Sequence, residues 1–264
     1  MLKTIKNNIT HPKHAFLYIK ERFIKIFLYI ITLTIIMSLP IIMLSILNPR
    51  ELVPNSSDLE GKYHYLYDEN FEIIDSKLIS NNNNLLIELG IFNVTFGDSY
   101  YDSTGYYLSF KENNIETYYN FGQGITIQNK TYEYKDYYIE NFKFEKGSSR
   151  VISNVITDIY SSNKLLIASL TISSILINLF DLLFIILLLS LLAHVTKRLP
   201  FKFKEHFNVN THIATIYAIS TLIMTLFNFK AVEFIPIIIV YIYQIIAYRS
   251  IRIIGKIKVR KKDE

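Results

Sequence analysis

The sequence predicts a polytopic α-helical membrane protein with four transmembrane helices and a strand-rich (α+β) extracytoplasmic domain between the first and the second. Three observations predict it: four long apolar segments, a one-sided distribution of basic residues, and a tyrosine-rich central region. The apolar segments are residues 26–47, 165–193, 211–229 and 232–248. At about 1.5 Å per residue each can cross a hydrocarbon core of roughly 30 Å, although the last is short and needs anchoring residues.

Lysine and arginine are concentrated in three parts of the chain, residues 1–25, the loop 194–210 and the tail 249–264. Basic segments of this kind stay on the cytoplasmic side of a membrane. We therefore expect both termini and the loop inside, and residues 48–164 outside. That outer segment has 10 basic and 17 acidic residues, so the net charge of +5 comes from the inner face. Attraction to anionic lipid headgroups explains this charge better than binding to nucleic acid, and no nucleic-acid partner is expected.

The first span is expected to be a retained signal anchor. Its apolar stretch is longer than the h-region of a typical signal peptide, and residues 47–50 offer no small-x-small cleavage site. Ahead of it, Phe16, Ile19 and Phe23 follow one another at helical spacing. This pattern predicts either a short helix in the cytoplasmic interface or a plain continuation of the first span.

The outer segment is predicted to be mostly β-strand. Aromatic and branched residues alternate there with polar ones, between clusters of Gly, Asn and Asp. The expected strands are residues 63–67, 71–74, 85–95, 105–110, 115–119, 125–128 and 132–144, followed by a helix over 151–164. The chain has no cysteine, so this domain of about 115 residues must depend on its own core.

Fourteen of the 20 tyrosines lie in the outer segment. Tyr132, Tyr134 and Tyr138 would share one face of its last strand and form a candidate surface for a sugar, a protein partner or headgroups. The alternative is structural, because Tyr is a good strand former and covers a half-buried sheet well. The sequence favours the structural use.

Polar residues form stripes along the second and third spans. The stripes consist of Thr171, Ser174, Asn178 and Asp181 in the second span and Thr215, Thr221 and Thr225 in the third. Asp181 lies near mid-membrane, where a charged side chain costs roughly 2.5–3.5 kcal/mol. Two facing stripes predict helix packing through interhelical hydrogen bonds. An ion or proton path centred on Asp181 and a docking site for another membrane protein are the alternatives.

Familiar catalytic motifs are absent from the chain, including G-x-S-x-G, H-E-x-x-H, the P-loop and the dinucleotide fingerprint. His194, His206 and His212 bracket the inner loop, but no two of them have the i, i+4 spacing of a helical metal pair. We interpret them as interfacial polar residues. No metal, no cofactor and no enzymatic activity are expected.

The stretch from His11 to Lys25, with Tyr29, Leu33 and Pro40, resembles the bacterial membrane-protein family called domain of unknown function 1189. Members of that family are often labelled maltodextrin-utilisation proteins, and its wider relatives are Yip-type membrane proteins. The layout of one span, an outer domain and a carboxy-terminal group of spans is similar too, as are residues 216–218. The resemblance implies membrane organisation or carbohydrate uptake rather than catalysis.

Abundant Lys, Asn and Ile without Trp favour an AT-rich bacterial genome, and we expect a multi-pass protein of the cytoplasmic membrane. Its expected partners are the lipid bilayer and a membrane protein such as a transporter subunit or a sensor. The leading hypothesis is a non-enzymatic accessory or sensory protein, linked to maltodextrin uptake. The alternative is a small transporter or ion-coupled component that uses Asp181.

Overall fold

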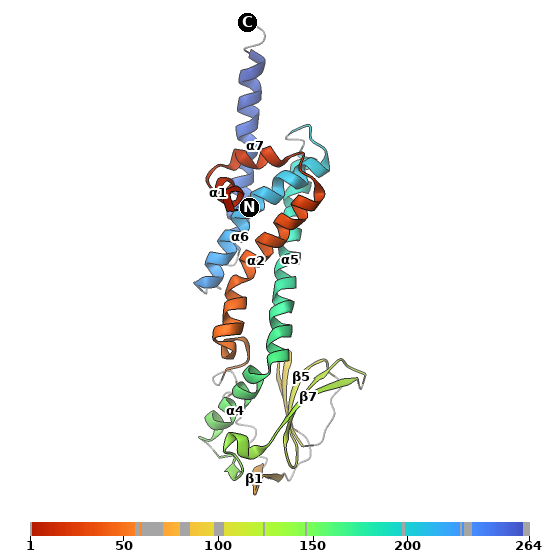
Figure 1. Ribbon diagram of the computed structural model, residues 1–264, viewed down its shortest axis with the longest axis vertical. Coiled ribbons are helices and arrows are strands. Elements are labelled where there is room, and N and C mark those ends of the chain that lie inside the picture. Colours follow the sequence, from red (N-terminus) through yellow and green to blue (C-terminus); the bar gives the residue numbers. More distant parts are fainter. Residues whose placement is uncertain are drawn as a thin grey trace. The chain divides into compact units, whose positions relative to one another are not determined.

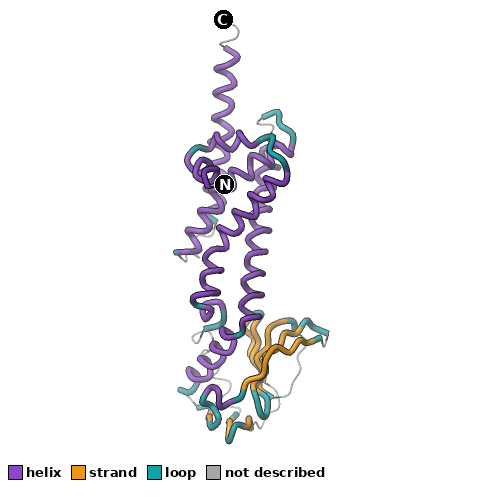
Figure 2. The backbone as a smooth tube through the Cα atoms, viewed as in Figure 1, coloured by secondary structure: helices purple, strands orange, loops and turns teal. Residues whose placement is uncertain are grey.

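The chain forms two compact units, one helical and one rich in strands (Figures 1 and 2). The helical unit consists of Met1–Ile46 and Ser169–Glu264, and the strand-rich unit of Leu47–Ala168. The computed structural model describes residues 2–55, 59, 71–79, 85–97, 103–123, 125–145, 147–196, 199–227, 229 and 234–260.

The described elements are α-helices, short 3₁₀ helices (η) and strands. The helices are α1 (Leu2–Thr10), η1 (Pro12–Tyr18), α2 (Phe23–Leu47), η2 (Pro49–Leu52), η4 (Tyr134–Tyr137), α4 (Ser149–Ser162), α5 (Lys164–Val195), α6 (Phe203–Leu226) and α7 (Ile235–Arg260). The strands are β1 (Glu72–Ile74), β2 (Lys77–Ile79), β3 (Leu85–Leu89), β4 (Phe92–Phe96), β5 (Gly105–Phe110), β6 (Ile115–Asn120), β7 (Thr126–Tyr132) and β8 (Phe142–Lys143).

Three helices of the described chain, α2, α5 and α6, are long and apolar enough to cross a membrane. The strand-rich unit lies between the first and second of them in the sequence. The predicted class, a protein of membrane-spanning helices with an α+β domain inserted after the first, is confirmed at this level. The apolar part of α7, Ile235–Ile251, is shorter than the other three.

Helix α6 begins at Phe203, eight residues before the expected start of the third span, and α7 continues to Arg260. The early start has a local cause. The Glu205 carboxylate accepts a hydrogen bond from the backbone N–H of Lys202 at 2.8 Å, and the Glu205 N–H donates to the Lys202 carbonyl at 2.9 Å, so these two residues cap the first turn. Hydropathy alone does not detect this cap, so the inner loop was predicted too long.

Residues 2–21, here called the N-terminal strap, fold back against the bundle. Helix α1 packs on α6, and η1 packs on both α6 and α7 (Figure 1). Ile5 and Ala15 of the strap belong to the hydrophobic core of the helical unit. A plain continuation of the first span is therefore wrong, because residues 19–22 separate the short helix η1 from α2; the interfacial position of that short helix stays a prediction.

The strand-rich unit contains two sheets. Strands β2, β1 and β8 form an antiparallel sheet in that order, and β3 to β7 form a five-stranded sheet in sequence order. All neighbours in the larger sheet are antiparallel except β4 and β5, which are parallel. Helix α4 is tied to this sheet by Tyr160, whose hydroxyl donates to the Asn93 carbonyl at 2.7 Å. The Tyr160 ring also packs edge-on against Phe92.

Two of the expected strands are interrupted in the structure; in addition, the strand expected at 125–128 continues to Tyr132 as β7, and β2 was not predicted. Residues 85–95 form a hairpin of β3 and β4, because Gly90 adopts a φ of 74° in a two-residue turn. Residues 132–144 are interrupted by η4, and Tyr138 has a left-handed φ of 57°. The tyrosines there cannot share one strand face. Strand β5 begins and ends where predicted, and the expected strand at 63–67 lies outside the described residues.

Gly105→Ala is expected to destabilise the strand-rich unit. A Cβ at this position would lie 2.8 Å from the Ile91 carbonyl oxygen, which belongs to the backbone and cannot rotate away. We expect a loss of about 1–3 kcal/mol, typical of overpacking. Thermal unfolding of the full chain in detergent measures it. Thr126→Ala on exposed β7 serves as the control, and an unchanged unfolding temperature for Gly105→Ala would show that the close approach is absent.

Candidate functional site

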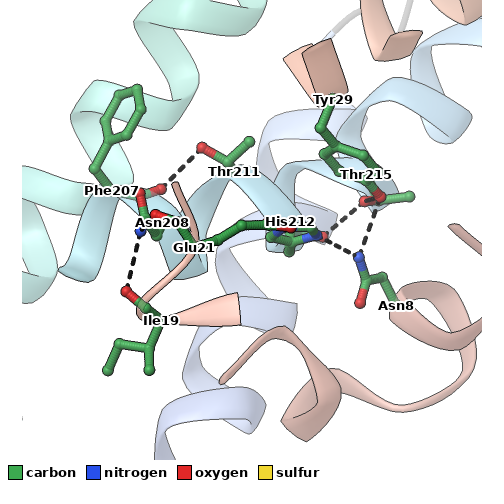
Figure 3. A network of polar contacts seen from close by, with 9 residues as sticks. All are labelled: Asn8, Ile19, Glu21, Tyr29, Phe207, Asn208, Thr211, His212 and Thr215. Carbon is green, nitrogen blue, oxygen red and sulfur yellow. Dashed lines mark hydrogen bonds and ion pairs between the residues drawn. The ribbon is translucent and has the colours of Figure 1, made fainter. Parts of the chain in front are cut away.

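A buried polar network centres on His212 of α6, where the strap meets the bundle (Figure 3). The His212 side chain is 2% exposed, and its Nε2 lies 3.0 Å from Glu21 Oε2. Its Nδ1 lies 2.9 Å from the Asn8 side-chain nitrogen. Tyr18 and Tyr29 stack on the imidazole, with ring centroids at 3.9 and 4.4 Å. The site thus draws one side chain from α6, one from α2 and three from the strap.

The hydrogen-bond directions in this network can be assigned from donor and acceptor chemistry. The Thr215 hydroxyl donates to the His212 carbonyl at 2.7 Å, so the Tyr29 hydroxyl must donate to Thr215 Oγ1, which lies 2.7 Å away. Tyr29 Oη then accepts from the Asn8 amide at 3.1 Å, and His212 Nδ1 accepts the second amide hydrogen. His212 Nε2–H therefore donates to the Glu21 carboxylate, and the imidazole is neutral.

Further polar contacts fasten the strap to the bundle. The Asn208 amide of α6 donates to the carbonyls of Ile19 and Glu21 at 3.0 and 3.1 Å. The Tyr243 hydroxyl of α7 donates to the carbonyls of Asn8 and Ile9. These bonds satisfy strap carbonyls that have no intrahelical partner, at the end of α1 and in the segment that follows η1.

A second buried network joins α5, α6 and α7. His206 Nδ1 lies 2.8 Å from the Tyr248 hydroxyl. The Gln244 amide donates to the Leu189 carbonyl at 2.7 Å and to Asn210 Oδ1 at 2.9 Å. The interpretation of His206 and His212 as interfacial loop residues was wrong, because both lie inside a helix and both side chains are buried. His194, at the end of α5, is exposed as expected.

The polar stripe of α5 meets two different helices. The Asn178 amide donates to Ser38 Oγ of α2 at 2.9 Å. Asp181, which is half-buried, accepts a hydrogen bond from the Tyr217 hydroxyl of α6. The partners Ser38 and Tyr217 were not among the predicted site residues.

Thr215 and Thr225 of the predicted α6 stripe have described contacts with groups outside the α5 stripe. Thr215 is buried and contacts Tyr29 of α2. Thr225 is exposed, and its hydroxyl donates to the Thr221 carbonyl one turn earlier. Thr171 and Ser174 are half-buried on α5. Among the described contacts, Asn178, Asp181 and Thr215 each bond to a residue outside the predicted stripes.

The three candidate tyrosines of the strand-rich unit lie in different surroundings. Tyr134 is fully buried, and its hydroxyl donates to the Lys111 carbonyl. Tyr132 is buried beneath Lys130, whose ammonium lies 4.6 Å from the ring centroid. Tyr138 alone is open to solvent, with 93% of its surface exposed. They do not form a joint binding surface, and two of the three have the structural role that the sequence favoured.

The chemistry available around His212 is proton transfer and hydrogen bonding. Within the described part of the chain no group of three or more His, Asp or Glu side chains could hold a metal ion. The sequence does contain a signal for this network: Asn208 lies about one turn before Thr211 and His212, so the polar stripe of the third span continues into the predicted loop. Because the third span was predicted to begin at residue 211, Asn208 was assigned to the loop, and His212 at the start of the span was interpreted as an interfacial residue.

Comparison with known proteins adds no relative: no family model, no curated protein and no solved structure matches the chain. The resemblance to the domain of unknown function 1189 family stays a prediction. Function must therefore be argued from the geometry of the chain.

Tyr217→Phe is expected to destabilise the helical unit by about 1–3 kcal/mol, because it removes the hydroxyl donor and leaves the Asp181 carboxylate unpaired in apolar surroundings. Asp181→Leu combined with Tyr217→Phe should recover part of that loss, since both polar groups are then gone. A double-mutant cycle on thermal unfolding in detergent measures the coupling. Additive losses, with no coupling between the two positions, would contradict the contact.

The strand-rich unit is expected to lose stability above about pH 10, the ordinary pKa of tyrosine. Burial raises the pKa of Tyr134, so the folded state holds this proton more tightly than the unfolded chain does. The resulting stabilisation is complete below the unfolded pKa and is lost as pH rises further toward the folded one. Tyr134→Phe should reduce the alkaline loss in pH-dependent unfolding. Tyr138→Phe, at an exposed position, should change nothing.

Proposed function

We propose that this chain is a non-enzymatic accessory or sensory protein of a bacterial cytoplasmic membrane, with four spans and both termini in the cytoplasm. The fourth span is α7, whose apolar part Ile235–Ile251 has a length of about 25 Å at 1.5 Å per residue. The sequence continues with basic residues, and such residues can reach the headgroups at the inner surface.

The observation that carries this proposal is the way in which the intramembrane polar groups are used. Asn178 joins α5 to α2, Asp181 joins α5 to α6, and Thr215 joins α6 to α2. Each bond links a different pair of helices. Polar groups in such an arrangement hold a bundle together, whereas a transport path needs groups that are free to exchange partners with the substrate.

A sensory role also requires a connection between the outer domain and the membrane helices. Asn163 supplies a one-residue link between α4 and α5. Its backbone N–H donates to the Tyr160 carbonyl at 3.2 Å, and its Oδ1 accepts from the Leu166 N–H at 3.1 Å. The same residue thus closes α4 and caps α5, so a displacement of α4 would reach the start of the second span through one residue.

One observation favours the alternative of an ion-coupled component. Asp181 is half-buried and is held by a single described side-chain bond, the one from Tyr217. A carboxyl with one neutral partner keeps free acceptor positions for a cation or a proton. Asp181→Asn preserves the shape of the side chain but removes its charge, and it therefore separates the two roles.

The deciding experiment crosslinks the tagged full-length protein in its native membrane, in cells grown with and without maltodextrin. Mass spectrometry then identifies what is captured. We expect one stoichiometric membrane-protein partner, a transporter subunit or sensor, captured equally by the Asp181→Asn variant. Absence of any partner in both conditions, together with a flux in reconstituted vesicles that Asp181→Asn abolishes, would replace the accessory role by the ion-coupled one.

A further inference from the structure

We propose that the N-terminal strap is released from the bundle by acid, because its docked contacts match the neutral imidazole of His212. When the strap is docked, His212 is closed off by Asn8, Tyr18 and Glu21. When it is undocked, these three contacts are lost. The strap is then a latch whose docking equilibrium follows the proton concentration on its side of the membrane. The latch would operate in either role considered above.

The first reason is the direction of the Asn8 hydrogen bonds. The side-chain nitrogen of Asn8 faces His212 Nδ1 at 2.9 Å and the Tyr29 hydroxyl at 3.1 Å, and both of these atoms act as acceptors. Asn8 itself is 1% exposed. A protonated His212 would place an N–H at Nδ1 directly against the amide N–H, and the bond would become a repulsive contact of two donors.

The second reason is the cost of burying a charged ring. Tyr18 and Tyr29 cover the imidazole by stacking, so a cation there would lose almost its entire hydration. The titratable groups in contact with His212 in the described chain are Glu21 of the strap, Tyr18 of η1 and Tyr29 of α2. Asn8 of α1 and Thr215 of α6 are neutral. Only Glu21 carries a charge that could compensate.

Glu21 opposes the release, because its carboxylate attracts a protonated His212. This attraction competes with the cost of burying the charged ring and of losing the Asn8 hydrogen bond. The Glu21 carboxylate lies 3.0 Å from His212 Nε2, but 19% of its side chain is exposed, so water weakens the ion pair. Neutral His212 already donates to the same oxygen, hence protonation at Nδ1 adds only charge to this contact. Against that gain stand the desolvation of the ring and the loss of the Asn8 bond. Desolvation of a buried ion usually exceeds what a single partner returns.

The unpaired Oδ1 of Asn8 shows how the strap could instead stay docked on a protonated His212. This oxygen is buried and has no hydrogen-bond partner among the described residues. A half-turn of the amide would aim it at His212 Nδ1, where it could accept a proton-bearing nitrogen. The rotated amide would move the nitrogen away from Tyr29, so the present orientation, with two acceptors served, belongs to the neutral state.

The sign of the pH dependence follows from these contacts. An imidazole in water takes up its proton near about pH 6.5, and the undocked state behaves in this way. The docked state stays neutral, so docking is strongest above that pH and weakens as pH falls below it. For one proton the docking constant should fall roughly tenfold between pH 7.5 and pH 5.5.

Hydrogen–deuterium exchange of peptides within residues 2–18 tests the latch in the full-length protein in lipid nanodiscs. After correction for intrinsic exchange rates, we expect roughly tenfold less protection at pH 5.5 than at pH 7.5. Asn8→Asp places a carboxylate against His212 Nδ1 and favours the cation, so this variant should keep its protection at pH 5.5. His212→Gln should abolish the pH dependence.

Two further histidines provide matched controls. His14→Gln removes a strap imidazole that stacks on His11, and His206→Gln removes the other buried imidazole of α6. Both variants should keep the tenfold change. Protection that is constant or rises at pH 5.5 in the wild type would overturn the proposal. So would an Asn8→Asp variant that loses protection as the wild type does, even if His212→Gln fails to dock at either pH.

Discussion

Hydrogen bonding inside an apolar bundle is the constraint on which the helical unit depends. A polar side chain left without a partner in such surroundings costs several kcal/mol, whereas a pair of them joins two helices. Asn178 with Ser38, Asp181 with Tyr217 and Tyr29 with Thr215 each provide one such joint. Helices α2, α5 and α6 are therefore arranged by a few specific bonds in addition to non-directional apolar packing.

The same constraint explains why the strap is part of the fold. His212 and Asn208 of α6 and Tyr243 of α7 present polar atoms to the strap, and the strap supplies their partners. Its own carbonyls gain donors in return. A segment that looks like a basic amphipathic tail in the sequence thus completes the hydrogen bonding of the bundle.

The apolar helices could be predicted well because length and hydropathy act over some 20 residues and tolerate local errors. Helix boundaries were less accessible, since the start of α6 depends on one capping contact between Glu205 and Lys202. In the strand-rich unit, β5 could be predicted because aromatic or branched residues alternate there with polar ones between two turns. The structure of the segment after β7 could not be predicted in this way. Its residues alternate as in a continuous strand, but a 3₁₀ turn and the left-handed Tyr138 interrupt it.

In the candidate site, too, local sequence patterns revealed single residues but not their partners. Asp181 and Asn178 were found because a polar residue in an apolar run is conspicuous, but their partners Tyr217 and Ser38 come from other helices. The His212 network was missed for a related reason. Asn8 and His212 are separated by 204 residues, and no local pattern brings them together. Contacts of this range are decided by tertiary packing, which one sequence does not reveal.

These long-range contacts also set an order for assembly during synthesis. Asn8 leaves the ribosome long before α7, yet its carbonyl is bonded by Tyr243, 235 residues later. At about 5–20 residues per second the strap must wait many seconds, with its apolar side chains uncovered, until α7 exists. During that interval Ile5 and Ala15 have no core to enter. The strap is therefore translated before the helices on which it packs, yet it reaches its final place only after them.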